Sequence, residues 1–417
     1  HVMSKGTSST RRVVITGMAG ITALGDNWET ISSRMAAGET GIRRMDDWDG
    51  KYDLRTRLAA PVQDFTLKGK FSRKQLRSMG RVAQLAVRST ELAFEDAGLL
   101  NDEILSSGEV GVAYGSSAGD TDAIADFGNM LLNHTSDGLN ANSYIKMMAH
   151  TAPVNIGIYF GLRGRVLTTS SACTSGSQAI GYAYEAIKYG HQTIMVAGGC
   201  EALCATEAAV FDTLYATSIK NDTPHLSPRP FDKQRDGPVI GEGGCTLILE
   251  DLEHALARNA FIYAELVGFG TNSDGSHVTQ PSAVTMEKAM RLALSCANVN
   301  PDEIGYISAH GTATDRGDIA ESSATAAVFG NNTPISSFKS FTGHTLGACG
   351  ALESWVAIQM MRENWFHATA NLDEVDPACG DLDYIMHEPR HIETDVIMSN
   401  NFAFGGINTS LIFKRWK

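Results

Sequence analysis

Hydrophobic positions in this chain follow two patterns: short apolar runs that end in glycine, and longer stretches with apolar residues at helical spacing. Residues 12–17 form the first short run and predict a buried strand that Gly17 closes. From Arg81 onward, apolar residues recur every three or four positions and predict an amphipathic helix that ends near Gly98. Residues 110–114 then predict another strand. This alternation of strands and helices is typical of an α/β fold.

One strand-to-helix corner carries a cysteine. The β-prone run that begins at Val166 ends in small residues, presents Cys173 and passes directly into a helical pattern that Gly190 stops. A nucleophile at such a corner is exposed on a sharp turn, and its small neighbours leave room for a substrate. The helix N-terminus is expected to lower the pKa of the thiol and to favour the thiolate. Cys173 is therefore a candidate nucleophile, with a buried structural cysteine as the alternative.

The same order of elements recurs later in the chain. A helix that ends near Asn298 precedes a strand over residues 302–309, which leads into the loop of His310. A further strand over residues 334–339 leads through the loop of His344 into another apolar helix. The recurrence predicts that the chain consists of two related α/β units.

We place these two pseudo-symmetric halves at residues 12–257, which contain Cys173, and at residues 258–416. The symmetry puts Cys173 and the His344 loop at equivalent corners, with His310 closing the site from a neighbouring strand. The second half also holds Lys339, at the end of its strand, and Phe404.

Composition and charge narrow the class of protein. The 417 residues are 43% hydrophobic and 19% charged, which fits a globular protein with one large core or two ordinary domains. A formal charge of -13 argues against nucleic acid or an anionic membrane as a partner. No apolar run is long enough to span a bilayer, and the seven cysteines lack metal-ligand spacing. We expect a cytoplasmic enzyme with free thiols, no metal site, no nucleic-acid partner and no membrane span.

Cys173 and the two histidines could together serve acyl transfer. A thiolate attacks a thioester, and imidazole Nε2–H groups stabilise the developing oxyanion or enolate. Both His310 and His344 lie in glycine-flanked loops after predicted strands, where ligand sites of α/β folds occur. Either histidine alone could instead be structural.

Further residues could assist this set. Lys339 with Asp318 or Glu321 could orient the histidines, and an ordinary salt bridge is the alternative. Phe404 precedes two glycines, an arrangement that suits a gate, and core packing of the Phe404 ring is the alternative.

The motifs resemble those of one known family. Residues 171–176 (Ser-Ala-Cys-Thr-Ser-Gly), 310–314 (His-Gly-Thr-Ala-Thr), 339–344 (Lys-Ser-Phe-Thr-Gly-His) and 401–406 (Asn-Phe-Ala-Phe-Gly-Gly) are similar to the signatures of β-ketoacyl-(acyl carrier protein) synthases of the thiolase-fold superfamily. The type II elongating condensing enzymes of fatty acid synthesis are the nearest broad match. Three stretches also resemble the branch found in aryl polyene pigment clusters: residues 77–81 (Arg-Ser-Met-Gly-Arg), 311–318 and 400–404 (Asn-Asn-Phe-Ala-Phe).

The resemblance implies a five-layered α-β-α-β-α thiolase-like fold, a homodimer, and an acyltransferase that works by a ping-pong, decarboxylative Claisen condensation. Cys173 would take an acyl chain, and the backbone N–H groups of Cys173 and Phe404 would form an oxyanion hole. His310 and His344 would assist decarboxylation of a malonyl thioester, with Lys339 and Glu321 supporting them. No cofactor is expected, because substrates arrive on the phosphopantetheine arm of acyl carrier protein.

The resemblance also implies where substrates bind. Positions expected along the phosphopantetheine and acyl path are Thr312, Thr314, Thr279, Phe402 and Ala118. Lys74 and Arg77 match residues that dock acyl carrier protein, and Arg81 could compensate for Ser78, which replaces a further basic residue. The alternative for this basic segment is a solvated helix face.

Two other functions remain open at this point. A thiolase acting on CoA thioesters needs a second cysteine as base, and Cys349 and Cys379 fall outside a matching motif. A non-catalytic partner subunit that resembles a chain-length factor typically lacks the nucleophilic cysteine that this chain has.

Overall fold

The computed structural model describes residues 9–214 and 216–417. Its centre is an 11-stranded sheet in the order β13-β11-β10-β15-β16-β9-β1-β8-β6-β4-β5. The strands of the N-terminal part are β1 (Val13–Ile21), β4 (Val110–Gly115), β5 (Val166–Thr168), β6 (Ile194–Glu201) and β8 (Gly243–Asp251). Those of the C-terminal part are β9 (Ala264–Ser273), β10 (Tyr306–Ser308), β11 (Pro334–Ser336), β13 (Asp383–Tyr384), β15 (Val396–Ala403) and β16 (Ile407–Arg415).

The order and direction of the strands are the same on both sides of the middle of the sheet. Outward from the short antiparallel β1–β9 pairing, one side runs β1-β8-β6-β4-β5 and the other runs β9-β16-β15-β10-β11. On both sides the first two pairings are antiparallel and the next two are parallel. This repeat of order and direction confirms the prediction of two pseudo-symmetric α/β halves.

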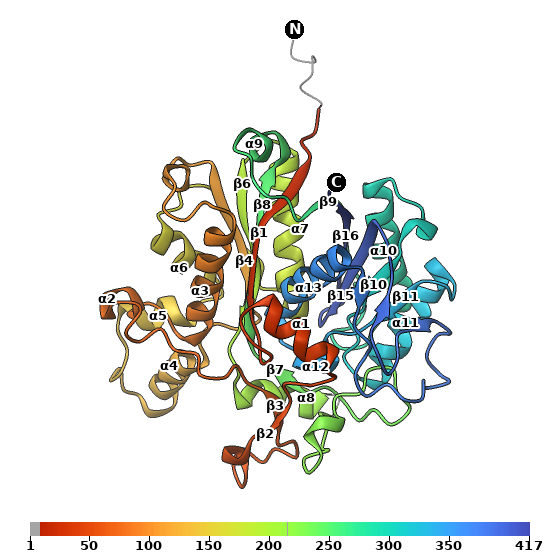
Figure 1. Cartoon of the computed structure of the whole chain (residues 1–417). Helices are drawn as coiled ribbons and strands as arrows, with labels where there is room; N and C mark the ends of the chain where they lie inside the picture. Colours follow the sequence, from red (N-terminus) through yellow and green to blue (C-terminus); the bar gives the residue numbers. More distant parts are fainter. Residues whose placement is uncertain (1–8, 215) are drawn as a thin grey trace.

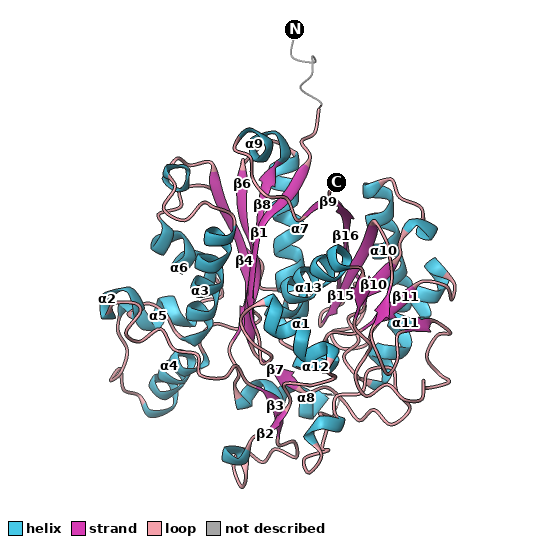
Figure 2. Ribbon diagram, viewed as in Figure 1, coloured by secondary structure: helices cyan, strands magenta, loops and turns pink. Residues whose placement is uncertain are grey.

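Helices complete five layers, which Figure 1 shows side by side. The outer helices α3 (Arg81–Asp96) and α6 (Thr151–Phe160) cover one half-sheet, and α10 (Ala283–Ala297) and α11 (Asp315–Phe329) lie beyond the other. Between the half-sheets lie α7 (Ser175–Lys188) and α13 (Cys349–Glu363). Figure 2 shows the same alternation of helices and strands across the molecule. The fold is the thiolase-like α-β-α-β-α arrangement that the sequence predicted.

Shorter elements surround these layers. The remaining helices are α1 (Trp28–Ala36), α2 (Arg73–Leu76), α4 (Thr121–Asn133), α5 (Ala141–Met147), α8 (Ala205–Leu214), α9 (Leu252–Ala257) and α12 (Lys339–Thr342). Two small sheets are formed by β2 (Arg43–Arg44), β3 (Leu58–Ala60) and β7 (Ile240–Gly241), and by β12 (Trp365–Phe366) and β14 (Arg390–His391). None of the helices in the described ranges combines the length and apolar character that a membrane span requires.

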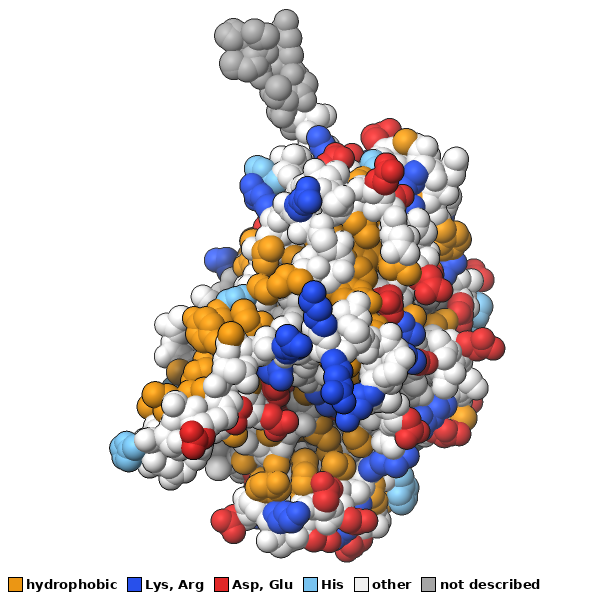
Figure 3. Space-filling model, turned by 90° about the vertical axis from the view of Figure 1, so that its left-hand side faces the viewer, with side chains coloured by type: hydrophobic (Ala, Val, Ile, Leu, Met, Phe, Trp, Pro, Cys, Tyr) orange, Lys and Arg blue, Asp and Glu red, His pale blue; other side chains and the backbone are white. Residues whose placement is uncertain are grey.

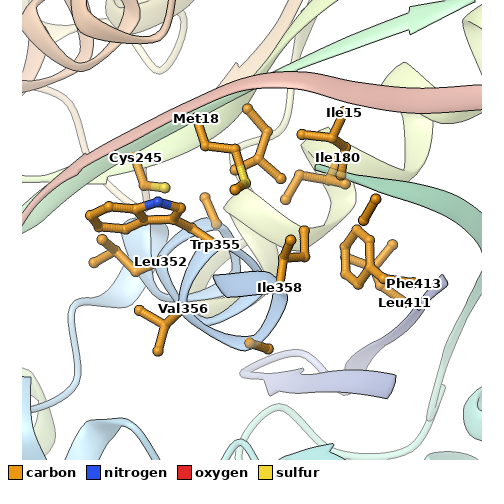
Figure 4. Packing of buried hydrophobic residues seen from close by; sticks show 14 of the residues in the cluster. Ile15, Met18, Ile180, Cys245, Leu352, Trp355, Val356, Ile358, Leu411 and Phe413 are labelled. Carbon is orange, nitrogen blue, oxygen red and sulfur yellow. The ribbon is translucent and has the colours of Figure 1, made fainter. Parts of the chain in front are cut away.

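The largest hydrophobic cluster lies where the central helices meet both half-sheets. Figure 4 shows Leu352, Trp355 and Ile358 of α13 packed against side chains from β1, α7 and β16. The two central helices approach each other closely at glycines. A Cβ on Gly176 would lie 2.9 Å from the Ala351 nitrogen, and one on Gly350 would lie 2.5 Å from the Ser177 nitrogen. The reciprocal contacts bring the N-termini of both helices, and the turns before them, into one site.

Three predicted strands differ from the structure in their bounds. The strand expected over residues 302–309 is β10 and begins only at Tyr306, because Pro301–Glu303 form a 3-10 turn. β1 does not close at Gly17 but continues to Ile21. Gly17 instead allows α3 to pack closely against β1, because a Cβ at this position would lie 2.5 Å from the Ala93 carbonyl oxygen of α3. The strand expected over residues 334–339 ends at Ser336, and Lys339 begins the short helix α12.

Candidate active site

Cys173 lies in a tight turn at the start of α7. A 3-10 turn over Ala172–Thr174 joins β5 to the helix, and Ala172 has a positive φ of 53°. The turn before α13 is built in the same way, with Leu346 at φ 53°. Left-handed backbone is uncommon for residues other than glycine, so the shared strain marks equivalent corners of the two halves. The residue after each is Cys173 in one half and Gly347 in the other.

His344 faces the thiol across the pseudo-twofold axis. Its Nε2 lies 3.0 Å from Cys173 Sγ, and the backbone N–H of Leu346 donates to its Nδ1 at 3.2 Å. Because Nδ1 accepts a hydrogen bond, the neutral ring carries its proton on Nε2. Burial, together with the nearby Lys339 charge, holds the pKa of His344 well below its usual value. His344 is therefore a neutral ring that presents Nε2–H to the sulfur.

His310 is fixed in the same tautomer by different partners. Lys339 Nζ lies 3.1 Å from His310 Nδ1, and Asn401 Nδ2 lies 3.2 Å from the same atom. Both groups donate, so the proton of the ring stays on Nε2. Burial, Lys339 and His344 hold the pKa of His310 well below its usual value. The His310 and His344 rings are perpendicular, with centroids 5.3 Å apart.

The carboxylate that holds Lys339 is Glu353 of α13. Its Oε2 accepts from Lys339 Nζ at 2.8 Å, and both side chains are 1% exposed. Burial alone would lower the pKa of Lys339, but Cys349 and Glu353 reverse that effect and raise it. Lys339 is thus a buried ammonium whose remaining donor reaches His310. The predicted support of a histidine by Lys339 is present in these contacts, through a carboxylate that the sequence analysis missed.

Glu321 supports the His310 loop through the backbone. Its carboxylate accepts the N–H groups of His310 at 2.8 Å and Gly311 at 2.7 Å. The expectation that Glu321 or Asp318 pairs with Lys339 is wrong. Asp318 lies 3.5 Å from Arg235 and accepts the N–H groups of Phe231 and Ala313. Both carboxylates hold loops rather than the imidazole.

The thiol of Cys173 differs from expectation in its acidity. Burial raises its pKa to about 12, and this outweighs the lowering by Lys339. Burial therefore opposes the lowering of the thiol pKa that was expected from the helix N-terminus. Donors surround the sulfur nevertheless, because the backbone N–H of Phe404 and His344 Nε2–H both reach it. These donors stabilise a thiolate once one forms.

Two cavities meet at Cys173. The first, of about 660 Å³, is lined by His310, His344, Phe402 and the three predicted threonines, Thr279, Thr312 and Thr314. Thr312 and Thr314 share a hydroxyl hydrogen bond of 3.0 Å. The second, of about 1050 Å³, is mostly apolar and includes Ala118. Every predicted substrate-binding residue therefore lines one of the two cavities.

Phe404 lies at the partition between the cavities. Phe404, Phe211 and Cys173 line both of them. The rings of Phe211 and Phe404 pack with centroids 5.1 Å apart, and Phe211 also contacts the His344 ring edge-on at 5.8 Å. Gly405 and Gly406 follow with φ of 84° and 70°. This position is the one that the gate hypothesis requires.

The predicted docking residues separate into two groups. Lys74 in α2 and Arg77 just after it are exposed. Helix α2 lies at the left-hand edge of Figure 1, and Figure 3 shows Lys and Arg side chains gathered on the face seen from that side. Arg81 instead forms a bidentate ion pair with Glu242, with two contacts of 2.9 Å. Glu242 also accepts the N–H of Leu203 and of Val62. The Arg81 charge is therefore engaged in holding the fold together, and the expectation that Arg81 docks a carrier is not supported by these contacts.

Within residues 9–214 and 216–417, two groups of side chains have the composition of metal ligands. Cys173, His310 and His344 form one, and His310, Cys349 and Glu353 form the other. The contacts described above leave the ring protons on Nε2 of both histidines, and an imidazole nitrogen must be unprotonated to bind a metal. The donor set therefore fits a nucleophile with two N–H donors better than an ion.

Sequence reasoning missed three residues of the site: Glu353, Asn401 and Cys349. Asn401 Nδ2 donates to Glu353 Oε1 at 2.9 Å, and Cys349 donates its S–H to the Cys173 carbonyl oxygen at 3.2 Å. Glu353 left a usable signal, because it is the one carboxylate among the first fourteen residues of the apolar helix α13. Asn401 opens the 401–406 motif and Cys349 was considered only as a thiolase base, so no local pattern indicated the contacts that they make here.

Fold and site together define a thiolase-fold condensing enzyme with a Cys-His-His centre. The family model for the β-ketoacyl synthase N-terminal domain matches residues 10–255, and that for the C-terminal domain matches residues 263–373. The chain belongs to the β-ketoacyl synthase family.

Curated relatives and solved structures agree with this assignment. The chain is 36% identical over 413 residues to 3-oxoacyl-[acyl-carrier-protein] synthase 2 of a Synechocystis species. The matched region covers 98% of this chain and 99% of the relative. It is 37% identical to the Vibrio cholerae enzyme of the same name, covering 98% and 100%. A crystal structure of a β-ketoacyl synthase from Burkholderia phymatum is 58% identical, with a TM-score of 0.96 and coverage of 98% and 100%. The ishigamide ketosynthase/chain length factor structure is 31% identical, with a TM-score of 0.89 and the same coverage.

Proposed function

We propose that this chain is an elongating 3-oxoacyl-(acyl carrier protein) synthase that joins a Cys173-bound acyl chain to a malonyl thioester. The observation that carries the proposal is the 3.0 Å contact between Cys173 Sγ and His344 Nε2, at the point where two cavities meet. One cavity suits the acyl chain, and the other suits the pantetheine arm and the malonyl group. The arrangement supports a ping-pong reaction with two half-reactions at one sulfur.

In the first half-reaction, the Cys173 thiolate attacks the carbonyl carbon of an acyl thioester. The negative charge develops on the carbonyl oxygen, which the backbone N–H groups of Cys173 and Phe404 can receive. The carrier thiolate then leaves with a proton, and the acyl chain remains on Sγ in the apolar cavity. No group beyond the chain's own residues is required.

In the second half-reaction, the malonyl thioester occupies the first cavity. Loss of carbon dioxide places charge on the thioester oxygen, and the Nε2–H groups of His310 and His344 point into that cavity as donors. The enolate carbon attacks the acyl carbonyl, and the Cys173 thiolate leaves. A β-ketoacyl thioester, longer by two carbons, is released. The lowered pKa of each ring favours its neutral form, which is the form that donates from Nε2–H alone.

The partners belong to the proposal. The solved complex AntDE:AntF is described as a type II polyketide acyl-carrier protein bound to its ketosynthase, and its matched chain is 29% identical to this one. We assign the exposed Lys74 and Arg77 to the equivalent contact with an acyl carrier protein. A second copy, or a related subunit, is expected against α4, where Leu131 and Leu132 are 77% and 79% exposed. The aryl polyene branch and a cytoplasmic location stay predictions.

The test of the proposal is an elongation assay with purified protein. An acyl-pantetheine and a malonyl-pantetheine thioester are supplied, and the β-ketoacyl product and carbon dioxide are measured. We expect product with the natural chain and none with Cys173→Ala. Product from Cys173→Ala, or none from the natural chain with any acyl length, would overturn the proposal.

A further inference from the structure

Helix α8 carries a carboxyl group into the acyl cavity. Glu207 is 9% exposed and lines the same cavity as Cys173. Its Oε2 is buried and has no hydrogen-bond partner among residues 9–214 and 216–417. Buried polar atoms are almost always paired, so an unpaired one in a substrate cavity is available to a polar group of the substrate.

The rest of this cavity offers little else to a polar substrate group. Its wall is mostly apolar, with Ile124 and Ala125 from α4 and Val210 from α8. Ser117 and Thr121 are further polar lining residues, and the Ser117 hydroxyl already donates to Glu201. Thr206 also lines it, but its hydroxyl donates to Cys204 Sγ at 3.0 Å. A plain alkyl chain on Cys173 would fill this space and leave the Glu207 oxygen unpaired. Such a chain would then carry the full cost of burying that atom.

The neighbouring carboxylates decide the charge of the group that fits. Burial raises the pKa of Glu207 well above its usual value, and Glu201, Cys204 and Glu242 reinforce that direction. Glu201 already accepts hydrogen bonds from the N–H groups of Ser117 and Gly347, and Glu242 already forms an ion pair with Arg81. A neutral Glu207 carboxyl can both donate and accept a hydrogen bond, as a hydroxyl can. An acidic chain end would meet three carboxyl groups and be disfavoured.

We propose that Glu207 determines acyl specificity by hydrogen bonding to an uncharged hydroxyl group on the acyl chain, so that hydroxylated chains are preferred to plain alkyl chains. This inference rests on the proposed function, because it assigns the acyl substrate class of the same site. A cavity that is built to pair with a hydroxyl rejects the analogue without it more strongly than an apolar cavity rejects an extra hydroxyl. We expect a preference on the order of tenfold, the value of one buried neutral hydrogen bond.

The test measures acyl loading of Cys173 in competition. Pantetheine thioesters of equal chain length are supplied in pairs, one alkyl and one with a single hydroxyl, and the hydroxyl is moved along the chain from pair to pair. Mass spectrometry of the Cys173 peptide gives the ratio of the two adducts. We expect one region of the chain in which the hydroxyl raises loading about tenfold. An amino-substituted and a carboxy-substituted chain are added as charged comparisons.

Three variants distinguish hydrogen bonding by Glu207 from the shape of the cavity as the cause of the preference for hydroxylated chains. Glu207→Leu should abolish the preference and improve loading of alkyl chains, whereas Glu207→Gln should keep part of the preference. Val210→Ala, on the same helix and in the same cavity, should change the loading of both members of each pair alike. The mass of the assembly is measured for each variant in solution.

Several results would overturn the inference. One is equal loading of hydroxylated and alkyl chains at every position, and another is an unchanged ratio in Glu207→Leu. A preference for the amino-substituted chain would show that Glu207 acts as an anion. A changed assembly mass in Glu207→Leu with an unchanged ratio would make Glu207 an interface residue. In all four cases the natural chain still loads Cys173, whereas failure to load any chain would reject the proposed function itself.

Discussion

Lys339 Nζ and His310 Nδ1 lie 3.1 Å apart, and this contact fixes which nitrogen of the ring can act on a substrate. The ammonium can only donate, so the imidazole must present Nε2–H to the cavity. Glu353 holds the ammonium from the other side at 2.8 Å. The chain therefore uses a buried ion pair to set a tautomer.

We expect Lys339→Met to slow malonyl decarboxylation by about 10²–10³, the usual loss when a transition-state donor is misplaced. Acyl loading should fall less, because Lys339 acts on the Cys173 thiol only through its charge. The two half-reactions are measured separately, as carbon dioxide release and as adduct formation. Glu353→Gln in the same background removes the unpaired buried carboxylate and serves as the folding control. Equal losses in both half-reactions would contradict the assigned role.

The acidity of the thiol gives a prediction for pH dependence. Burial raises the pKa of Cys173 to about 12, so its thiolate fraction is on the order of 10⁻⁵ at pH 7 and rises about tenfold with each pH unit. Alkylation of Cys173 in the free protein should therefore increase about tenfold per unit between pH 6 and 9 without a plateau. The rate is followed by mass spectrometry of the Cys173 peptide. A plateau below pH 8 would show that the helix N-terminus dominates after all.

The rate of Cys173 alkylation over the same pH range, measured on His344→Ala, tests whether His344 stabilises the thiolate. Loss of the Nε2–H donor 3.0 Å from Sγ should lower the alkylation rate at every pH in the range. An unchanged rate would mean that His344 does not act on the sulfur.

Carrier docking should depend on the basic segment at α2. The protein has a net charge of -13, and acyl carrier proteins of this family are expected to be acidic, so a local positive patch is needed for encounter. Lys74→Glu with Arg77→Glu should raise the KM for carrier-bound substrates, most strongly at low salt. Turnover of a small pantetheine thioester should stay near that of the unmodified chain.

A charge-matched control lies at the far end of β16. Lys414 is exposed at the opposite end of this strand from Phe404, about 25 Å away at the usual rise per residue. Lys414→Glu with Lys417→Glu changes the net charge equally and should leave the KM for carrier-bound substrates nearly unchanged. If both double variants behave alike, net charge rather than a docking site explains the effect.

The packing of the two central helices predicts a stability difference. Gly350→Ala would place a Cβ 2.5 Å from the Ser177 nitrogen of α7 and should destabilise the protein by about 1–3 kcal/mol through overpacking. Gly157→Ala lies within α6 with nothing within 4 Å of the added Cβ, and it should stabilise by about 0.5–1 kcal/mol. Urea unfolding of both variants gives the comparison. Similar effects would mean that the helices can move apart.

Residues with a local pattern were predictable from the sequence, and those placed by tertiary contacts were not. The corner at Cys173 and the helix after it follow from apolar spacing and small residues, and the repeated order of elements indicated the two halves. The extent of β1 was missed, because Gly17 allows α3 to approach closely and does not end the strand. No local pattern distinguishes those two roles of a glycine.

The partners of charged groups could not be predicted from the local sequence either. Lys339 was predicted to support a histidine, but Glu353, fourteen residues later on another helix, holds it instead of Glu321. Arg81 belongs to a basic run in the sequence, yet it pairs with Glu242, 161 residues away. The pKa of Cys173 depends on burial that only the assembled halves create. Glu207 could not be predicted for the same reason, because only the folded structure shows that its Oε2 is buried without a hydrogen-bond partner.

The most direct test of the central claim is the mass of the Cys173 peptide before and after malonyl thioester is added. With acyl-pantetheine alone, we expect one acyl adduct on Cys173. On addition of malonyl-pantetheine, the adduct should disappear as a β-ketoacyl product longer by two carbons and carbon dioxide form in equal amounts. An adduct on Cys349, or product formation while the Cys173 adduct persists, would contradict the account.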